Sequence, residues 1–155
     1  MKLITIFTAM LLAVVHAEEV KRPLFYPFDV TIDGQKAAMQ EDNTLFAVIE
    51  KPVKADALLE IGKEAPSIII NAFAVNEKGE VMQPGQQPAI IFANKTTSTK
   101  LSATIDKKPL KPGRYLANIV ANGGTSRVVF VIEDKSGKIK IPSIKDLVDF
   151  MKKNS

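Results

Sequence analysis

The sequence contains no cysteine and no tryptophan, and it has a single histidine, His16, among its 155 residues. Without cysteine the chain has no disulfide bridge, no thiolate nucleophile and no thiolate ligand for zinc or copper. Aromatic residues make up only 6% of the chain, so few side chains are available to stack on sugars or bases. These absences exclude thiol-based catalysis and thiolate metal centres.

The N-terminal segment has the layout of a secretory signal peptide. Lys2 supplies a positive charge, Leu3–Val15 is an uncharged apolar run, and small or short side chains stand before a cleavage position after Ala17. The run is shorter than the roughly 18 apolar residues that a membrane-spanning helix needs. We therefore expect residues 1–17 to be a cleaved signal peptide and residues 18–23 to be a flexible lead-in.

Cleavage at this position also removes His16. The mature chain then has no histidine, which excludes Ser-His and Cys-His catalysis and histidine-bound zinc, copper or haem. We expect no cofactor, no metal ligand and no catalytic residue. No later apolar stretch is long enough to cross a membrane. Export without disulfides is typical of a bacterial envelope protein, so we expect a periplasmic or extracellular location.

The composition favours one packed domain, because 46% of the residues are hydrophobic and the length fits a single core. The formal net charge is +4, and basic residues gather near 107–114 and 135–140. Acidic residues are interspersed, so we interpret these groups as solvated lysines. No aromatic residues lie between the basic ones, and nucleic acid is therefore not expected as a partner.

Alternation of apolar and polar residues dominates positions 24–141 and predicts about seven to nine short β-strands. The segment Ala55–Ile61 fits either a strand ended by Gly62 or two turns of helix. Asn122-Gly123-Gly124 predicts a tight hairpin, and the apolar run at 67–75 predicts a strand buried on both faces. The other expected strands cover residues 28–32, 44–50, 80–82, 89–93, 101–105, 114–121, 125–133 and 138–141.

The hydrophobic period changes at the C-terminal end. Ser143 with Asp146 forms a capping-box pattern, and the apolar residues at 144, 147, 148 and 151 fall on one helical face. The opposite face carries charges of both signs, which disfavours a membrane surface. We expect residues 142–155 to form a short amphipathic helix packed on the domain or on a protein partner.

The segment Leu110-Lys111-Pro112-Gly113-Arg114-Tyr115 stands before the predicted strand and hairpin. It resembles the tyrosine corner of immunoglobulin-like and fibronectin type III-like domains. The resemblance extends over about residues 105–133, and the tryptophan and cysteine pair of antibody domains are absent. It implies an all-β, antiparallel immunoglobulin-like sandwich in which the Tyr115 hydroxyl bonds the backbone of the preceding corner.

Carboxylate chemistry remains available to such a chain. Asp29 with Asp33, or Glu41 with Asp42, provides paired carboxylates for calcium or for a glycosidase. Their spacing matches no calcium-binding loop, and we interpret them as surface carboxylates.

The remaining candidate sites are two serine–lysine pairs and a glycosylation sequon. Ser98 with Lys100, or Ser126 with a nearby lysine, would form a Ser-Lys dyad, but the chain contains no S-x-x-K pattern. Asn94-Lys95-Thr96 matches the N-glycosylation sequon, which matters only in a eukaryotic source.

The leading functional hypothesis is a non-enzymatic exported protein that binds a protein or a component of the cell envelope, through loops or an exposed strand edge. A carbohydrate- or small-ligand-binding module is the second hypothesis, and a carboxylate-based hydrolase is the third. Phe25, Tyr26 and Phe28 form either an aromatic binding lip, which would favour sugars, or a first strand packed into the core. A long uncovered edge strand would favour a protein partner.

Overall fold

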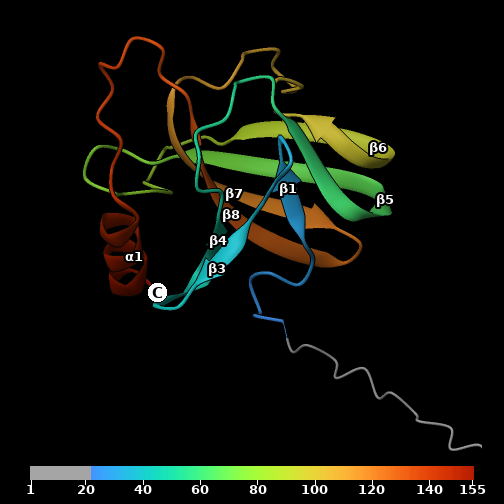
Figure 1. Ribbon diagram of the computed structural model, residues 1–155, viewed down its shortest axis with the longest axis horizontal. Helices are drawn as coiled ribbons and strands as arrows, with labels where there is room; N and C mark the ends of the chain where they lie inside the picture. The colour runs from blue at the N-terminus through green and yellow to red at the C-terminus, as the bar shows by residue number, and fades with distance from the viewer. Residues whose placement is uncertain (1–21) are drawn as a thin grey trace, which may run out of the picture.

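The computed structural model describes residues 22–155, so the expected signal peptide and most of the expected lead-in lie outside the described residues. This part of the chain is mostly β-strand with one C-terminal helix, as predicted (Figure 1). It has eight strands, a number within the predicted range. The elements are β1 Val30–Ile32, β2 Gln35–Lys36, β3 Ala38–Gln40, β4 Asn43–Val48, β5 Leu58–Ala74, β6 Ala89–Lys100, β7 Gly113–Ala121, β8 Gly124–Ile132 and α1 Ile144–Lys153.

All eight strands belong to one curved sheet that is nearly barrel-shaped. The strand order is β2-β1-β5-β7-β8-β4-β3, and β6 pairs with β5. Neighbouring strands run antiparallel except β4 and β8, which pair in parallel at Ala47–Val128 and Val48–Val129. The expectation of purely antiparallel pairing is therefore wrong. The chain from β5 to β7 supplies the long crossover connection that a parallel pair needs.

β5 is the longest strand and joins the two halves of the sheet. Residues 59–61 pair with β1 and residues 69–74 pair with β7, while β6 follows the opposite edge of β5. The start of β5 settles Ala55–Ile61 in favour of strand, but the expectation that Gly62 ends this strand is wrong. Gly62 falls where the β5–β6 register slips, and both Gly62 and Pro66 lie between the parts of β5 that pair with β1 and with β7. They therefore disturb the ladder little.

The main hydrophobic core fills the inside of the curved sheet. Alternate residues along the central strands point inward, and Ile70, Ile91, Ile119 and Phe130 are completely buried there. Burial of a side chain of this size contributes about 1.5–3 kcal/mol. Alternation in the sequence identifies this inner face correctly, because one side of each strand must leave water.

β7 and β8 form the predicted tight hairpin. The turn residues Asn122 and Gly123 have φ angles of 50° and 76°. Positive φ at both central positions is the requirement of a type I′ turn, which asparagine followed by glycine meets with little strain. The predicted strands at 114–121 and 125–133 are confirmed to within a residue at each end.

Two segments predicted as strands, 80–82 and 138–141, are irregular instead. Before the first segment, Asn76 Oδ1 accepts hydrogen bonds from the backbone N–H groups of residues 78 and 80. Before the second segment, the Asp134 carboxylate accepts from the backbone N–H groups of residues 136 and 139. Such local bonds compete with a strand ladder, and alternation of polarity does not report them.

The third segment incorrectly predicted as a strand is 101–105. The chain turns at the end of β6 and returns only as far as an isolated bridge between Thr104 and Ile91. The Ile105 backbone N–H donates to the Ile90 carbonyl beside this bridge. Burial does not follow the alternation here, because Leu101 and Thr104 are buried whereas Ala103 and Ile105 are exposed.

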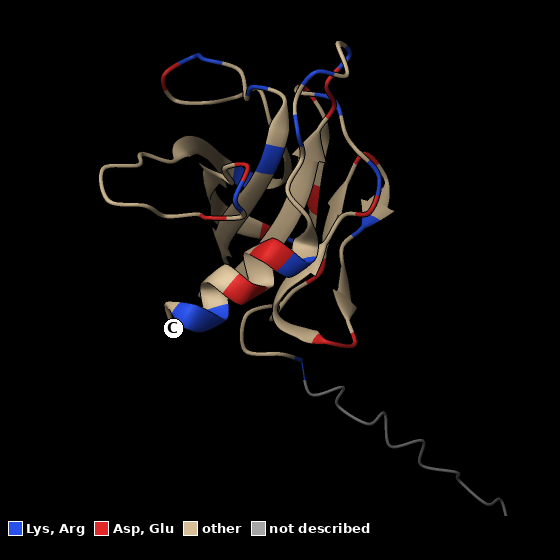
Figure 2. Cartoon of the chain, turned by 90° about the vertical axis from the view of Figure 1, so that its left-hand side faces the viewer, with Lys and Arg blue, Asp and Glu red and all other residues tan. Residues whose placement is uncertain are grey.

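α1 begins at the predicted capping box. Ser143 Oγ accepts from the Asp146 N–H, and the Asp146 carboxylate accepts from the Ser143 N–H. Leu147 and Val148 are buried on the outer face of the sheet, so the helix packs on its own domain. The exposed side carries charges of both signs (Figure 2). The partners of the buried side chains are Phe46, Val48, Val75, Val81, Leu116 and Val129.

Tyr115 forms the contact that the tyrosine-corner resemblance implies. Its hydroxyl donates to the Lys111 carbonyl at 2.9 Å. Its ring stacks on Phe130 with ring centroids 5.7 Å apart, in an offset geometry that favours aromatic pairs. The side chain therefore joins the corner before β7 to the core.

Tyr26 is a second buried tyrosine with a bridging hydroxyl. The hydroxyl accepts from the Val30 N–H and donates to the Ala37 carbonyl, both at 3.0 Å. These two bonds connect the segment before β1 to the chain between β2 and β3. Of the two interpretations of this aromatic group, the packed one applies to Tyr26, which is only 6% exposed.

The buried tyrosines predict a loss of stability in alkali. Burial raises the pKa of both Tyr26 and Tyr115 above 10.0. The tyrosine pKa in the unfolded chain is near 10, and a higher pKa in the folded state means that the neutral hydroxyl favours folding. This contribution to stability is fully present below pH 10 and is lost as the pH rises through the folded-state pKa. The free energy of unfolding should fall by up to about 1.4 kcal/mol per pH unit for each tyrosine. Urea unfolding at pH 8 and pH 11 checks this, and an equal pH dependence in wild type and Tyr26→Phe would contradict it.

Candidate functional site

The outer face of the sheet carries a group of apolar side chains beyond the area that α1 covers. Phe92 of β6, Ile69 of β5 and Val120 of β7 lie opposite one another in a row across three strands. The adjacent residues Ile70 and Ile119 face the main core, so this row points outward.

A second row lies closer to α1. Asn71 of β5 stands opposite Ile90 of β6 on one side and Asn118 of β7 on the other, and Asn118 stands opposite Arg127 of β8. Ile105 extends this row past β6, because its backbone bond places it beside Ile90. The row therefore runs from an apolar end at Ile105 to a cationic end at Arg127.

The apolar residues of these two rows form one surface, which we call the outer patch. Phe92 is 47% exposed and Ile105 is 62% exposed, while the other members are partly exposed. The face of a sheet that borders water normally carries polar residues. Contiguous exposed apolar surfaces are candidates for interaction sites. The outer patch consists of Ile69, Ile90, Phe92, Ile105 and Val120.

Arg127 provides the only charge within these two rows. Its Nε donates to Asn118 Oδ1 at 3.2 Å, and its guanidinium carbon lies 4.3 Å from the centre of the Phe25 ring. Partial burial lowers the pKa of Arg127. Within residues 22–155, Arg127 takes part in none of the salt bridges. A held, half-buried guanidinium with no carboxylate partner is suited to binding an anionic group.

A groove of about 590 Å³ separates Arg127 from the end of α1. Met82, Phe150 and Met151 line it with apolar side chains, and Glu80, Gln83 and Asn154 line it with polar ones. Figure 2 shows the uncharged loop of residues 81–88 extending from the sheet on the side of α1. The groove thus adjoins Arg127, at the cationic end of the second row.

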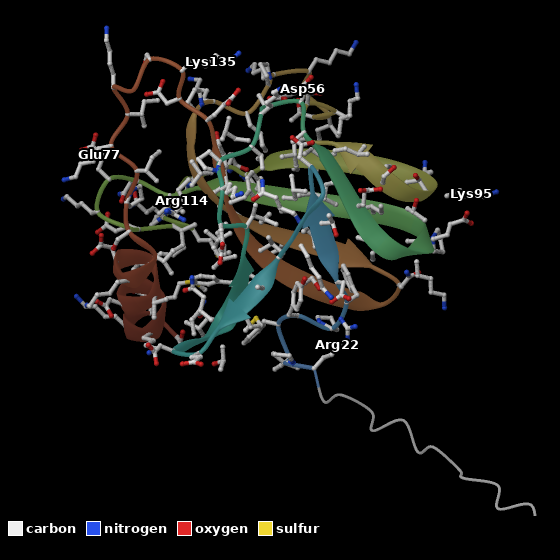
Figure 3. The ribbon with its side chains drawn as sticks, viewed as in Figure 1. Arg22, Asp56, Glu77, Lys95, Arg114 and Lys135 are labelled. Carbon is white, nitrogen blue, oxygen red and sulfur yellow. The ribbon has the colours of Figure 1, made fainter. Side chains whose placement is uncertain are left out.

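The free edge of β6 is less suitable for a partner than the sheet face. In the described chain it meets only the bridge from Ile91 to Thr104. Farther along, Thr96 Oγ1 accepts from the Ser98 N–H and donates to the Ser98 carbonyl. Lys95 has a φ of 43° and stands at the far end of the β5–β6 ribbon from α1 (Figure 3). These features blunt the edge against strand addition.

The paired carboxylates do not converge. Asp29 lies 2.8 Å from Arg22 and 3.0 Å from Lys36, and hydrogen bonds from Arg22 and then Lys36 lower the pKa of Asp29. Asp33 instead accepts from the Leu58 backbone N–H at 3.0 Å. Each carboxylate therefore has a separate structural bond.

The other acidic pair, Glu41 and Asp42, occupies the exposed turn between β3 and β4. In residues 22–155 no three or more Asp, Glu, His or Cys side chains come together as a group that could hold a metal ion.

The serine candidates lie apart from one another. Ser126 is completely buried, and its hydroxyl donates to the Phe28 carbonyl and accepts from the Phe28 N–H. Ser98 and Lys100 both lie on β6, and no hydrogen bond joins them in the described structure. Asn94 of the sequon is exposed on the same strand. Ser126 thus fixes the chain before β1.

The three aromatic residues near the described N-terminal end serve different roles. Tyr26 is buried, Phe25 lies under the Arg127 guanidinium, and Phe28 packs against the core. They do not form a flat exposed lip.

One member of the expected basic groups is structural. Arg114 is half-buried and its Nε donates to the Pro142 carbonyl at 2.8 Å, which fixes the approach to α1. The remaining lysines of both groups are exposed. The charged residues labelled in Figure 3 are spread around the molecule rather than gathered on one surface.

Sequence reasoning did not identify the outer patch or Arg127. The available signal was the apolar run at 67–75, which predicted a strand buried on both faces. The structure instead leaves Ile69 partly exposed on the outer face. Residues that are apolar on both faces of a strand indicate either a second covering layer or an interaction surface, and the pattern does not distinguish the two.

No family model, curated protein or solved structure matches the chain. Within residues 22–155, no helix is long and apolar enough to span a membrane.

Proposed function

We propose that this chain is an exported, non-enzymatic protein of the bacterial periplasm or cell exterior that binds another protein through the outer patch. The observation that supports the proposal is the open apolar row of Phe92, Ile69 and Val120 on a sheet face beside a packed helix. Burying such side chains against a partner removes apolar area from water at about 25 cal/mol per Å².

We also propose that the curved sheet is a variant of the immunoglobulin-like sandwich. The Tyr115 bond to the Lys111 carbonyl and the β7–β8 hairpin that follows it support this assignment. The parallel pairing of β4 with β8 departs from the antiparallel pattern.

A protein partner is favoured over a carbohydrate. Sugar-binding surfaces present aromatic rings flat to the solvent, whereas Tyr26 is buried and the Phe25 ring is covered by Arg127. The outer patch is mainly aliphatic, and aliphatic surfaces exclude water without offering hydrogen bonds to sugar hydroxyls.

Capture of the partner by patch variants tests the proposal. The protein, expressed from the full sequence, is used to capture proteins from the native envelope, beside the double variant Phe92→Ser/Ile105→Ser. We expect the captured protein to fall at least tenfold with the double variant, because hot-spot residues carry most binding energy. Ile139→Ser is the matched control, since Ile139 is 44% exposed on a loop away from the patch. Equal capture by all three proteins would reject the outer patch as the binding surface.

A further inference from the structure

We infer that the outer patch receives an amphipathic α-helix of the partner protein, which lies beside α1 and places a carboxylate on Arg127. The inference rests on the proposed function and specifies the occupant of the same surface. It follows from the spacing of the rows, from the blunted edge of β6 and from Arg127 at one end of the second row, which has no salt-bridge partner in the described part of the chain.

The spacing of the rows matches a second helix. α1 packs over the row that contains Leu116 of β7. The middle of the open surface, at residue 119, is three positions along β7, or about 10 Å at 3.3 Å per residue. Helices pack side by side at axial distances of about 8–10 Å. A helix on the outer patch would therefore contact both the sheet and the exposed flank of α1.

The length of the second row fixes the length of the occupant. From Arg127 on β8 to Ile105 the row crosses β7, β5 and β6, which gives four gaps between neighbouring segments. At about 4.8 Å per gap the row spans about 19 Å, the length of about 13 residues of α-helix. α1 crosses the same sheet in this manner, because its buried contacts come from β4, β7 and β8.

The two ends of the row differ in chemistry, which places the acidic residue of the occupant at one end. At one end Ile105 is apolar and exposed. At the other end Asn118 and Phe25 hold the Arg127 guanidinium, whose remaining N–H groups make no side-chain hydrogen bond within residues 22–155 and can bind a carboxylate through two hydrogen bonds. Lys152 and Lys153 in the last turn of α1 add positive charge to the same side of the sheet.

Glu80, the acidic residue that lines the groove, does not pair with Arg127. Glu80 Oε2 accepts from the Asn76 and Gln83 side-chain amides, both at 2.7 Å. This carboxylate is therefore bonded within its own loop. The partner's acidic residue is expected on the β8 side of the groove, against Arg127.

The test selects peptides of about 16 residues from a random phage-displayed library on the folded protein, expressed from the full sequence. Enriched peptides should carry apolar residues at i, i+3, i+4 and i+7 together with an Asp or Glu near one end. Their binding should weaken at least tenfold with Phe92→Ser and remain unchanged with Ile139→Ser. The acidic preference should disappear in a selection on Arg127→Gln, while Arg127→Lys, which keeps the charge, should retain part of it. Unfolding curves confirm that each variant is folded.

The other outcomes are distinct. Enrichment of peptides that alternate apolar and polar residues, and that bind Phe92→Ser as well as wild type, would overturn the inference that the occupant is a helix. The proposed function would then still be decided by the capture experiment. Helical peptides without an acidic preference would overturn the role of Arg127. Failure to enrich any peptide would overturn the inference, whereas failure of the proposed function appears separately as capture that does not depend on Phe92 and Ile105.

Discussion

Replacing Gly79 by alanine is expected to destabilise the protein by about 3 kcal/mol. Gly79 has a φ of +81°, and an added Cβ would lie 2.6 Å from Asp146 Cβ and 2.7 Å from the Asp146 carbonyl carbon. The left-handed backbone alone costs an alanine about 1–2 kcal/mol. The contact with the α1 backbone adds about 1–3 kcal/mol, because the helix must move.

Gly85→Ala is the matched control for this prediction. Gly85 has the same φ of +81°, but nothing lies within 4 Å of its added Cβ. We expect this variant to lose only the backbone cost of about 1–2 kcal/mol. Urea unfolding of both variants gives the difference, and hydrogen exchange of α1 shows whether the helix loosens. Equal destabilisation of the two variants would show that the 76–79 turn does not hold α1.

Tyr26→Phe is expected to cost about 3 kcal/mol although it removes a single oxygen atom. The Tyr26 hydroxyl satisfies both the Val30 N–H and the Ala37 carbonyl, and Val30 and Ala37 are almost completely buried. Without the hydroxyl, two buried backbone groups have no partner, at about 1–3 kcal/mol each. The loss is larger than for an ordinary hydrogen bond, because water does not replace the hydroxyl in a packed core.

Tyr115→Phe is the matched control, because it also removes a tyrosine hydroxyl but does not leave two buried backbone groups without a partner. The Tyr115 hydroxyl makes one hydrogen bond, to the carbonyl of the exposed residue Lys111, which water reaches after the substitution. We expect a cost of about 1 kcal/mol, measured by the same urea unfolding experiment at pH 7. A cost for Tyr26→Phe no greater than for Tyr115→Phe would mean that the two backbone groups find other partners.

Elements with purely local causes were predictable. The capping box of Ser143 and Asp146 and the turn at Asn122 depend on neighbours within a few residues, and both are confirmed. Residues 80–82 and 138–141 were incorrectly predicted as strands, because Asn76 and Asp134 bind nearby backbone groups. A polarity pattern reports which side chains avoid water, but it does not report these competing hydrogen bonds.

The candidate site depends on contacts between distant segments, and sequence reasoning missed it for that reason. Phe92 and Val120 become neighbours only because β5 lies between β6 and β7. Arg127 stands over Phe25, which is about 100 residues earlier in the chain. Register and strand order decide such contacts, and a one-residue slip would move the whole outer patch into the core.

The sequence by itself determined a chain without cysteine, the hairpin at Asn122-Gly123 and a capped C-terminal helix, because composition and local periodicity suffice for these. Only the tertiary structure decided that the helix covers part of the outer face and leaves the row of Phe92, Ile69 and Val120 open. The physical reason is that apolar residues on the second face of a strand need a cover, and nothing local specifies whether the same chain or another protein supplies it.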